Sequence, residues 1–143
     1  MQEAARAKGV RLQVLKASSE SEIDAAFASL PQLQAGALVV GTDAFFESRG
    51  EQLVALALRH KVPAIYEMRG FAEAGGLISY GPNYAGWWHQ VGTYLGKILN
   101  GAKPADLPVQ QPTTFDLVVN LKTAEELGLM PPSILARATE VIE

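Results

Sequence analysis

The side chains that could bind a small polar molecule fall in three short segments, each placed where an apolar run ends. The segments are Gly41-Thr42-Asp43, Glu67-Met68-Arg69 and Tyr80-Gly81-Pro82-Asn83-Tyr84. A zwitterion with an apolar or aromatic side chain would suit them. Asp43 and Glu67 would receive an ammonium group, N–H groups at a helix start would receive a carboxylate, and tyrosine rings would pack on the side chain. The predicted ligand-binding residues are therefore Thr42, Asp43, Glu67, Tyr80, Gly81, Asn83 and Tyr84.

Several of these residues, and the two tryptophans, also have a purely structural interpretation. Asp43 is equally well placed to cap the N-terminus of the helix that follows it. Glu67 and Arg69 could form only a solvated ion pair. Trp87 and Trp88 favour a core or interface position over a ligand cage, because apolar residues recur around them at helical spacing.

The sequence contains no pattern typical of catalysis or of metal binding. Ser79 has no histidine beside it, and neither a GxSxG motif nor a paired-carboxylate arrangement occurs. His60 and His89 are far apart, and the chain has no cysteine, so a metal site is not expected. The glycines of 70–76 lack the spacing that cradles a phosphate. We therefore predict a protein that is not an enzyme and that carries no cofactor.

Composition excludes further classes of function. The 143 residues carry a net charge of −3 with no cluster of lysine or arginine, which disfavours binding to nucleic acid or to an anionic membrane. No apolar run approaches the roughly 20 residues that cross a bilayer, and the start MQEAARAKG lacks the pattern of a signal peptide. A hydrophobic fraction of 48% predicts a soluble globular protein.

Residues 10–66 alternate between strand and helix patterns. Strands are predicted at 10–15, 35–40 and 62–66, the second of them apolar throughout and so covered on both faces. A capping box of Ser19 and Glu22 opens a helix that ends at Pro31, and a second helix precedes the third strand. This order predicts an α/β fold with right-handed crossovers, a three-layer αβα Rossmann-like parallel sheet. Ligands bind such sheets beyond the carboxyl ends of the strands.

The remainder of the chain is arranged around residues 75–99. A strand at 77–80 leads into a long helix with one apolar face, closed by Asn100-Gly101. Residues 2–8 are predicted to be the end of a helix with Gly9 behind it, and 67–74 a crossing segment with one helical turn. After the helix come a proline-rich connector at 102–114, a strand at 115–121 and a short helix at 123–128. A last helix is predicted from Pro131-Pro132, with Ile134, Leu135, Ala138, Val141 and Ile142 as its apolar stripe.

Four phrases of the sequence resemble a known family. They are GGLISYG at 75–81, YLGKILNGAKPADLPVQQPT at 94–113, FDLVVNLKTAEELG at 115–128 and PPSILARATEVIE at 131–143. In these four segments the chain resembles the ABC transporter substrate-binding proteins of the tryptophan/tyrosine-binding-like family. The resemblance covers essentially all 143 residues, but only the C-terminal part of such a two-lobed protein.

The resemblance implies a type I periplasmic-binding-protein-like lobe. Residues 1–74 would form a second-lobe α/β unit, 75–103 a crossing strand and helix of the first lobe, and 104–143 a connector returning to the second lobe with C-terminal helices. Thr42 and Asp43 would correspond to a strand-end pair facing the cleft, and Tyr80, Gly81 and Asn83 to the ligand side of the crossing segment. The implied function is solute binding for an ABC importer. An amino-acid-like solute, an ABC permease partner and a periplasmic or cell-envelope location go with it.

Two other functions stay open from the residues alone. A ligand-sensing domain of a signalling protein could share this fold, and a small α/β enzyme is a further alternative. Without a first lobe, residues 75–99 would lack their native sheet and expose a large apolar face. We therefore expect a homodimer through Trp87, Trp88, Val91 and Tyr94.

Overall fold

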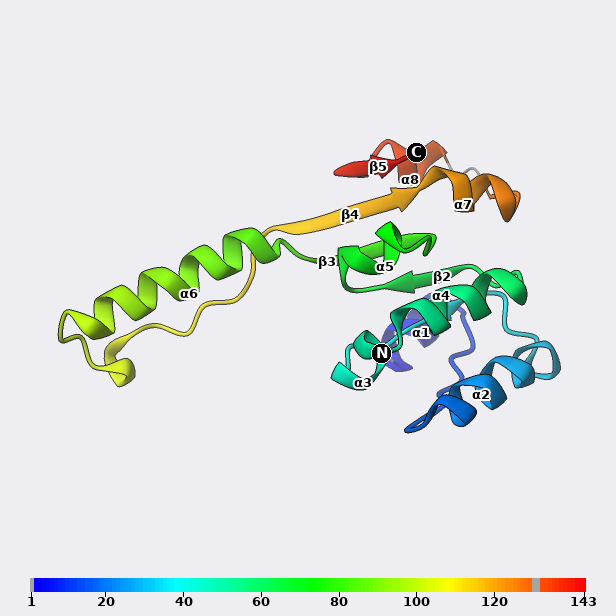
Figure 1. Cartoon of the computed structure of the whole chain (residues 1–143), viewed down its shortest axis with the longest axis horizontal. Helices are drawn as coiled ribbons and strands as arrows, with labels where there is room; N and C mark the ends of the chain where they lie inside the picture. The colour runs from blue at the N-terminus through cyan, green and yellow to red at the C-terminus, as the bar shows by residue number, and fades with distance from the viewer. Residues whose placement is uncertain (1, 130–131) are drawn as a thin grey trace.

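The computed structural model describes residues 2–129 and 132–143 of the chain, which fold into a sheet flanked by helices (Figure 1). The strands are β1 (Leu38–Val39), β2 (Ala64–Tyr66), β3 (Ile78–Pro82), β4 (Phe115–Asn120) and β5 (Glu140–Ile142). The helices are α1 (Gln2–Ala7), α2 (Glu20–Leu33), α3 (Ala44–Ser48), α4 (Gly50–Arg59), α5 (Arg69–Glu73), α6 (Tyr84–Leu99), α7 (Leu121–Glu126) and α8 (Pro132–Leu135), with a 3₁₀ turn η1 (Pro104–Asp106).

The sheet confirms the predicted α/β class. Its order is β1-β2-β3-β4-β5, and β1/β2, β2/β3 and β4/β5 are parallel pairs. The β3/β4 pair is antiparallel, from Ile78 opposite Val119 to Pro82 opposite Phe115. The sheet is thus mostly parallel, as predicted, and β3/β4 differs because the chain returns from α6 directly alongside β3. No helix crosses the sheet between the two strands, and a parallel pair would require such a crossover.

One face of the sheet carries the core. Helices α2, α4 and α5 cover this face, and the buried apolar residues are Ile23, Phe27, Leu30, Leu53, Val54, Leu56, Ala57, Val62, Ala64, Tyr66 and Phe71. The opposite face is only partly covered, since Val39, Tyr80 and Val141 are 55%, 52% and 40% exposed. The predicted second helix layer is therefore incomplete over β1 and β3. The apolar run at 35–40 contributes only the two-residue β1, with one exposed residue.

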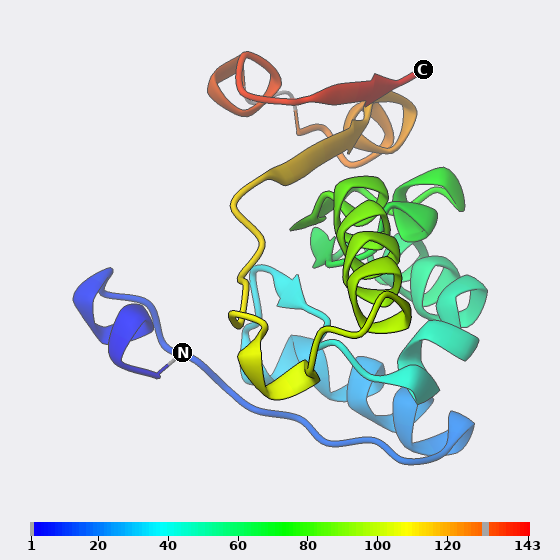
Figure 2. The same ribbon diagram turned by 90° about the vertical axis from the view of Figure 1, so that its left-hand side faces the viewer.

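Helix α6 and the connector behind it extend away from the sheet (Figures 1 and 2). No residue of α6 is buried. The preceding strand β3, in contrast, lies within the sheet between β2 and β4. The segment that extends from the sheet therefore begins at Asn83, directly after β3.

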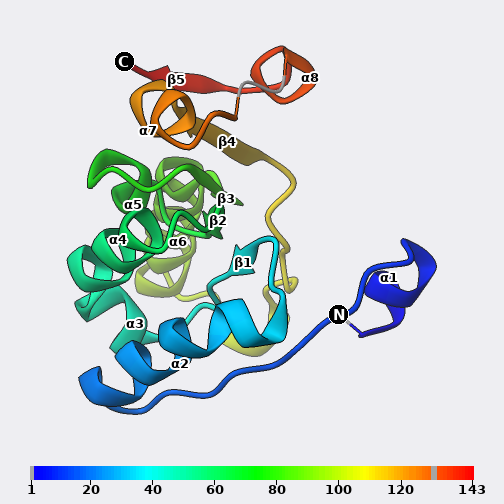
Figure 3. The same ribbon diagram turned by 90° about the vertical axis from the view of Figure 1, so that its right-hand side faces the viewer.

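Residues 10–15 form no strand, contrary to the prediction. The segment is extended but unpaired, with Val10 and Val14 60% and 65% exposed, and it leads from α1 to α2 (Figure 3). An alternating pattern forms a strand only when a neighbouring strand accepts its hydrogen bonds. Here β1 bonds to β2 alone, and residues 10–15 make no pairing with its free side.

The predicted cap of α2 is confirmed in part. Glu22 N donates to Ser19 Oγ at 3.3 Å, but the Glu22 carboxylate accepts from Ser18 N, at 2.6 Å, and not from Ser19. The hydrogen bonds that Ser18 donates to this carboxylate, from its N–H and from its hydroxyl, lower the pKa of Glu22. The helix also continues through Pro31 to Leu33.

The C-terminal helix was predicted too long. Helix α8 ends at Leu135, and residues 140–142 form β5, parallel to β4. Thr139 directs the chain onto the sheet, since its Oγ1 accepts from Leu117 N at 2.8 Å and its own N–H donates to Leu117 O at 2.8 Å. These long-range bonds outweigh the helical spacing of the apolar residues. Pro131 lies outside the described residues.

Candidate functional site

The predicted site residues that come together lie at the carboxyl edge of β1, β2 and β3. Glu67 directly follows β2, and Tyr84 is the first residue of α6. The Tyr84 hydroxyl donates to Glu67 Oε1 at 3.0 Å, and both residues are half-buried. Burial first, and then the hydrogen bond to Glu67, raises the pKa of Tyr84. The phenol therefore stays protonated and holds the carboxylate at the end of the sheet.

Gly81 brings the end of β3 against the end of β2. A Cβ atom at this position would lie 2.4 Å from the carbonyl oxygen of Glu67 and 2.9 Å from its Cγ, so only glycine fits. Thr42, beyond the end of β1, lines a small hollow together with Glu67, Tyr66 and Met68. Thr42 and Glu67 thus line one small hollow at this edge.

Asn83 lies beside this group, but both ends of its amide are already occupied. Its Oδ1 accepts from Gly86 N at 2.7 Å, which caps α6, and its Nδ2 donates to Asp116 Oδ2 at 2.9 Å. Asp116 is a residue that sequence reasoning missed. It pairs with Gly81 in the antiparallel register, and its signal was a single carboxylate at the start of the apolar strand pattern of 115–121.

The other two predicted site residues make structural contacts. The Asp43 carboxylate accepts from Phe45 N at 2.8 Å, so it caps α3 as the alternative interpretation expected. Tyr80 stacks on Phe115, with ring centroids 5.6 Å apart, on the partly bare face of the sheet. Successive strand residues point to opposite faces, so Tyr80 faces away from its neighbour Gly81.

Arg69 does not pair with Glu67, contrary to one interpretation of the sequence. Its guanidinium instead contacts Glu73 one helical turn away and Glu140 of β5, the latter at 2.6 Å. The hydrogen bond to Arg69 lowers the pKa of Glu140. Glu67 is consequently left to the Tyr84 hydroxyl and to the edge of the sheet.

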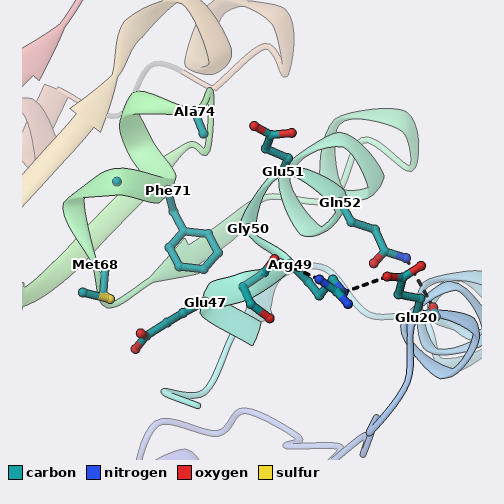
Figure 4. Close-up of a pocket in the computed structure, with 11 residues that line it drawn as sticks. Glu20, Glu47, Arg49, Gly50, Glu51, Gln52, Met68, Phe71 and Ala74 are labelled. Atoms are coloured by element: carbon teal, nitrogen blue, oxygen red, sulfur yellow. Dashed lines mark hydrogen bonds and ion pairs between the residues drawn. The ribbon is translucent and has the colours of Figure 1, made fainter. Parts of the chain in front are cut away.

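A wider depression, of about 690 Å³, lies between α4 and α5 (Figure 4). Phe71, Met68 and Ala74 supply apolar groups to it, and glutamates stand around them. Arg49 in its wall forms an ion pair with Glu20 at 2.8 Å. None of the predicted ligand-binding residues lines this depression.

The fold and the site together define a class of protein. A mostly parallel sheet presents a carboxylate, a hydroxyl and a helix start at its carboxyl edge, which is typical of ligand-binding α/β domains. Within 2–129 and 132–143, no group of three or more His, Asp or Glu side chains could hold a metal ion. In those same ranges, no helix is long and apolar enough to cross a membrane.

The sequence family agrees with this class. The family model for ABC transporter substrate binding protein matches residues 1–142, and the chain belongs to this family. Its members are binding proteins, a class without enzymatic activity. No curated protein matches the chain.

Solved structures show the same fold. A conserved domain protein from Vibrio cholerae O1 biovar eltor strain N16961 matches with a TM-score of 0.87 at 28% identity, over 98% of this chain and 47% of its own. An ABC domain in complex with L-Trp from Streptococcus pneumoniae matches with a TM-score of 0.85 at 29% identity, over 98% and 49%. A ligand-free, open substrate binding protein with adhesive properties from Clostridium difficile reaches 0.71 at 27% identity, over 99% and 47%. The chain therefore spans about half the length of these proteins.

Proposed function

We propose that this chain is part of the solute-binding component of an ABC importer and binds a small amino-acid-like solute at the carboxyl edge of β1–β3. The observation that carries the proposal is the Glu67 carboxylate, held at this edge by Tyr84 in a member of the substrate-binding family. The structural relative with L-Trp bound supports a ligand of this class. An ABC permease partner and an extracytoplasmic location follow from the same proposal.

Each group at the edge has a role in this proposal. Glu67 would receive the ammonium group of the solute, and the Thr42 hydroxyl would add a hydrogen bond from the same hollow. The first N–H groups of α6, at Tyr84 and Ala85, would face the carboxylate of the solute. The Tyr84 ring would border the solute's side chain. No bond is made or broken, and the solute is held by closure of two lobes around it.

The second lobe of the cleft is also part of the proposal. Helix α6 and the connector project from the sheet without burying a residue, as expected if they pack in a different lobe from β1–β5. In the full-length context, α6 would lie in that lobe, and the solute would bind between α6 and the sheet edge.

Calorimetry with a panel of amino acids, L-Trp included, tests the proposal. A solute that binds the chain should lose affinity in Glu67→Gln by about tenfold or more, since a charge-assisted hydrogen bond contributes about 1.5–3 kcal/mol. Glu126→Gln is the matched control. Glu126 is an exposed carboxylate at the end of α7, beyond the opposite edge of the sheet. Equal affinity of the two variants would refute the assignment of Glu67.

We propose further that α6 mediates homodimer formation when no other lobe covers it. Trp87 and Trp88 are 42% and 62% exposed, and Val91 and Tyr94 continue the same helix. Burying this surface at roughly 25 cal/mol per Å² would contribute several kcal/mol per chain. Sedimentation velocity should show a dimer that Trp88→Glu dissociates, with exposed Lys103→Glu as the control. A monomeric wild-type chain at micromolar concentration would contradict the dimer.

A further inference from the structure

Helix α6 meets the sheet only through its first turn. The main chain continues the β3/β4 ladder by one bond, from Asn83 N to Thr114 O at 2.9 Å. Beyond that turn, the side-chain hydrogen bonds of α6 to other segments reach the connector alone, from Tyr94 Oη to Pro108 O at 2.7 Å and from Gln90 to Gln110. Among the described residues, then, the hydrogen bonds that join α6 directly to the sheet lie at residues 83 and 84.

Two side-chain hydrogen bonds flank this exit point. On the β2 side, Tyr84 donates to Glu67 at 3.0 Å, and on the β4 side, Asn83 donates to Asp116 at 2.9 Å. Strands β2 and β4 are the two neighbours of β3 in the sheet. The first turn of α6 is thus tied to a carboxylate on either side of the strand from which it emerges.

We propose that the Asn83–Asp116 pair is a positioning device that sets the angle at which α6 leaves the sheet, and that Asn83 is not a contact of the solute. An amide is the side chain that fits, because its oxygen accepts from Gly86 N while its nitrogen donates to Asp116. Each end of the amide therefore has a hydrogen-bond partner within the chain, and this fixes its orientation.

The length of α6 amplifies what happens at its first turn. Its 16 residues span about 24 Å at 1.5 Å per residue. A rotation of roughly 10° at Asn83 therefore moves the far end of the helix by about 4 Å. If α6 forms one wall of the solute cleft, as the proposed function holds, the Asn83–Asp116 pair sets the width of that cleft.

The pair can be broken and then rebuilt with charges exchanged. In Asn83→Asp, two carboxylates face each other at hydrogen-bond distance and no donor joins them, so the tie to β4 is lost. In the double variant Asn83→Asp/Asp116→Asn, the carboxylate at 83 still caps Gly86 N and accepts from the new amide at 116. The double variant therefore restores the hydrogen bond between positions 83 and 116, with donor and acceptor exchanged.

Spin-label distances measure the angle directly and without any solute. The chain has no cysteine, so Lys97→Cys and Lys122→Cys place one label at the far end of α6 and one on α7. The expected result is a narrow distance distribution for the parent, loss of that narrow peak in Asn83→Asp, and its return in the double variant. Far-UV circular dichroism identifies variants that fail to fold. If Asn83→Asp does not fold, Asp116→Ala, which removes the acceptor without adding charge, replaces it.

Two results would overturn the proposal. One is a distribution that stays narrow when the pair is broken, and the other is a double variant as broad as the single one. Because these distances need no ligand, the outcome does not depend on the proposed function. If a solute binds, the double variant should also recover affinity, which a direct contact between Asn83 and solute would not allow.

Discussion

Replacing Gly81 by alanine tests how closely β3 approaches β2 at the candidate site. The added Cβ would lie 2.4 Å from Glu67 O and 2.9 Å from Glu67 Cγ, whereas carbon atoms in contact normally lie at about 3.5–4.0 Å. The nearest atom belongs to the backbone, so no rotamer change can relieve the overlap, and the two strand ends must separate by about 1 Å. Such overpacking typically costs about 1–3 kcal/mol. The φ of Gly81 is not positive, so the cost is steric.

Urea unfolding of the chain measures this cost, with Gly41→Ala as the matched control. Gly41 lies just beyond the end of the parallel strand β1, but a Cβ there would meet nothing within 4 Å. The control should change the free energy of unfolding by less than about 0.5 kcal/mol. Gly81→Ala should lower it by about 1–3 kcal/mol. It should also weaken the Tyr84–Glu67 hydrogen bond, because Glu67 is the residue that must move. If the two alanine variants were equally stable, the close approach of β3 and β2 would be refuted.

Three further predictions concern single side chains. Tyr66→Phe should stabilise the chain by about 1 kcal/mol in urea unfolding, because the buried Tyr66 hydroxyl has no hydrogen-bond partner within the described residues. A loss of stability in this variant would contradict the prediction. Asp43→Ala should destabilise the chain by about 1 kcal/mol through loss of the α3 cap, and Asp43→Ser should restore most of the lost stability. An unchanged urea midpoint for the alanine variant would argue against a cap. Tyr84 should ionise above the ordinary tyrosine pKa of about 10, so its stabilising contribution is complete below pH 10 and is lost as pH rises through the raised pKa. Difference absorbance between the parent and Tyr84→Phe measures that titration, and an ordinary value would contradict the Glu67 hydrogen bond.

The elements that the sequence predicted well are those with strong local signals. Helix α6 was predicted from its long apolar face and its Asn100-Gly101 end, and it ends at Leu99, directly before that pair. The cap by Ser19 and the left-handed glycines at 9 and 128 are likewise local features. Where neighbouring residues along the chain decide the conformation, the pattern was sufficient.

The elements that it predicted wrongly depend on distant partners. Residues 10–15 have a strand pattern, but no strand lies beside them, and residues 140–142 have helical spacing but pair with β4. In both segments, the deciding hydrogen bonds join residues far apart in sequence. Local periodicity carries no information about those bonds.

Within the candidate site, the rule that ligands bind beyond the carboxyl ends of parallel strands placed Thr42, Glu67 and Tyr84 at one edge. The alternation of side chains along a strand already separates Tyr80 from Gly81, so their placement on opposite faces was contained in the sequence. The presence of Asp116 at this site could not be predicted in the same way, because the rule about carboxyl ends considers only where strands end. An antiparallel strand contributes its beginning to the same edge, and β4 begins at Phe115-Asp116, opposite Pro82 and Gly81. Only the strand direction, which follows from the return of the chain after α6, makes Asp116 part of the site.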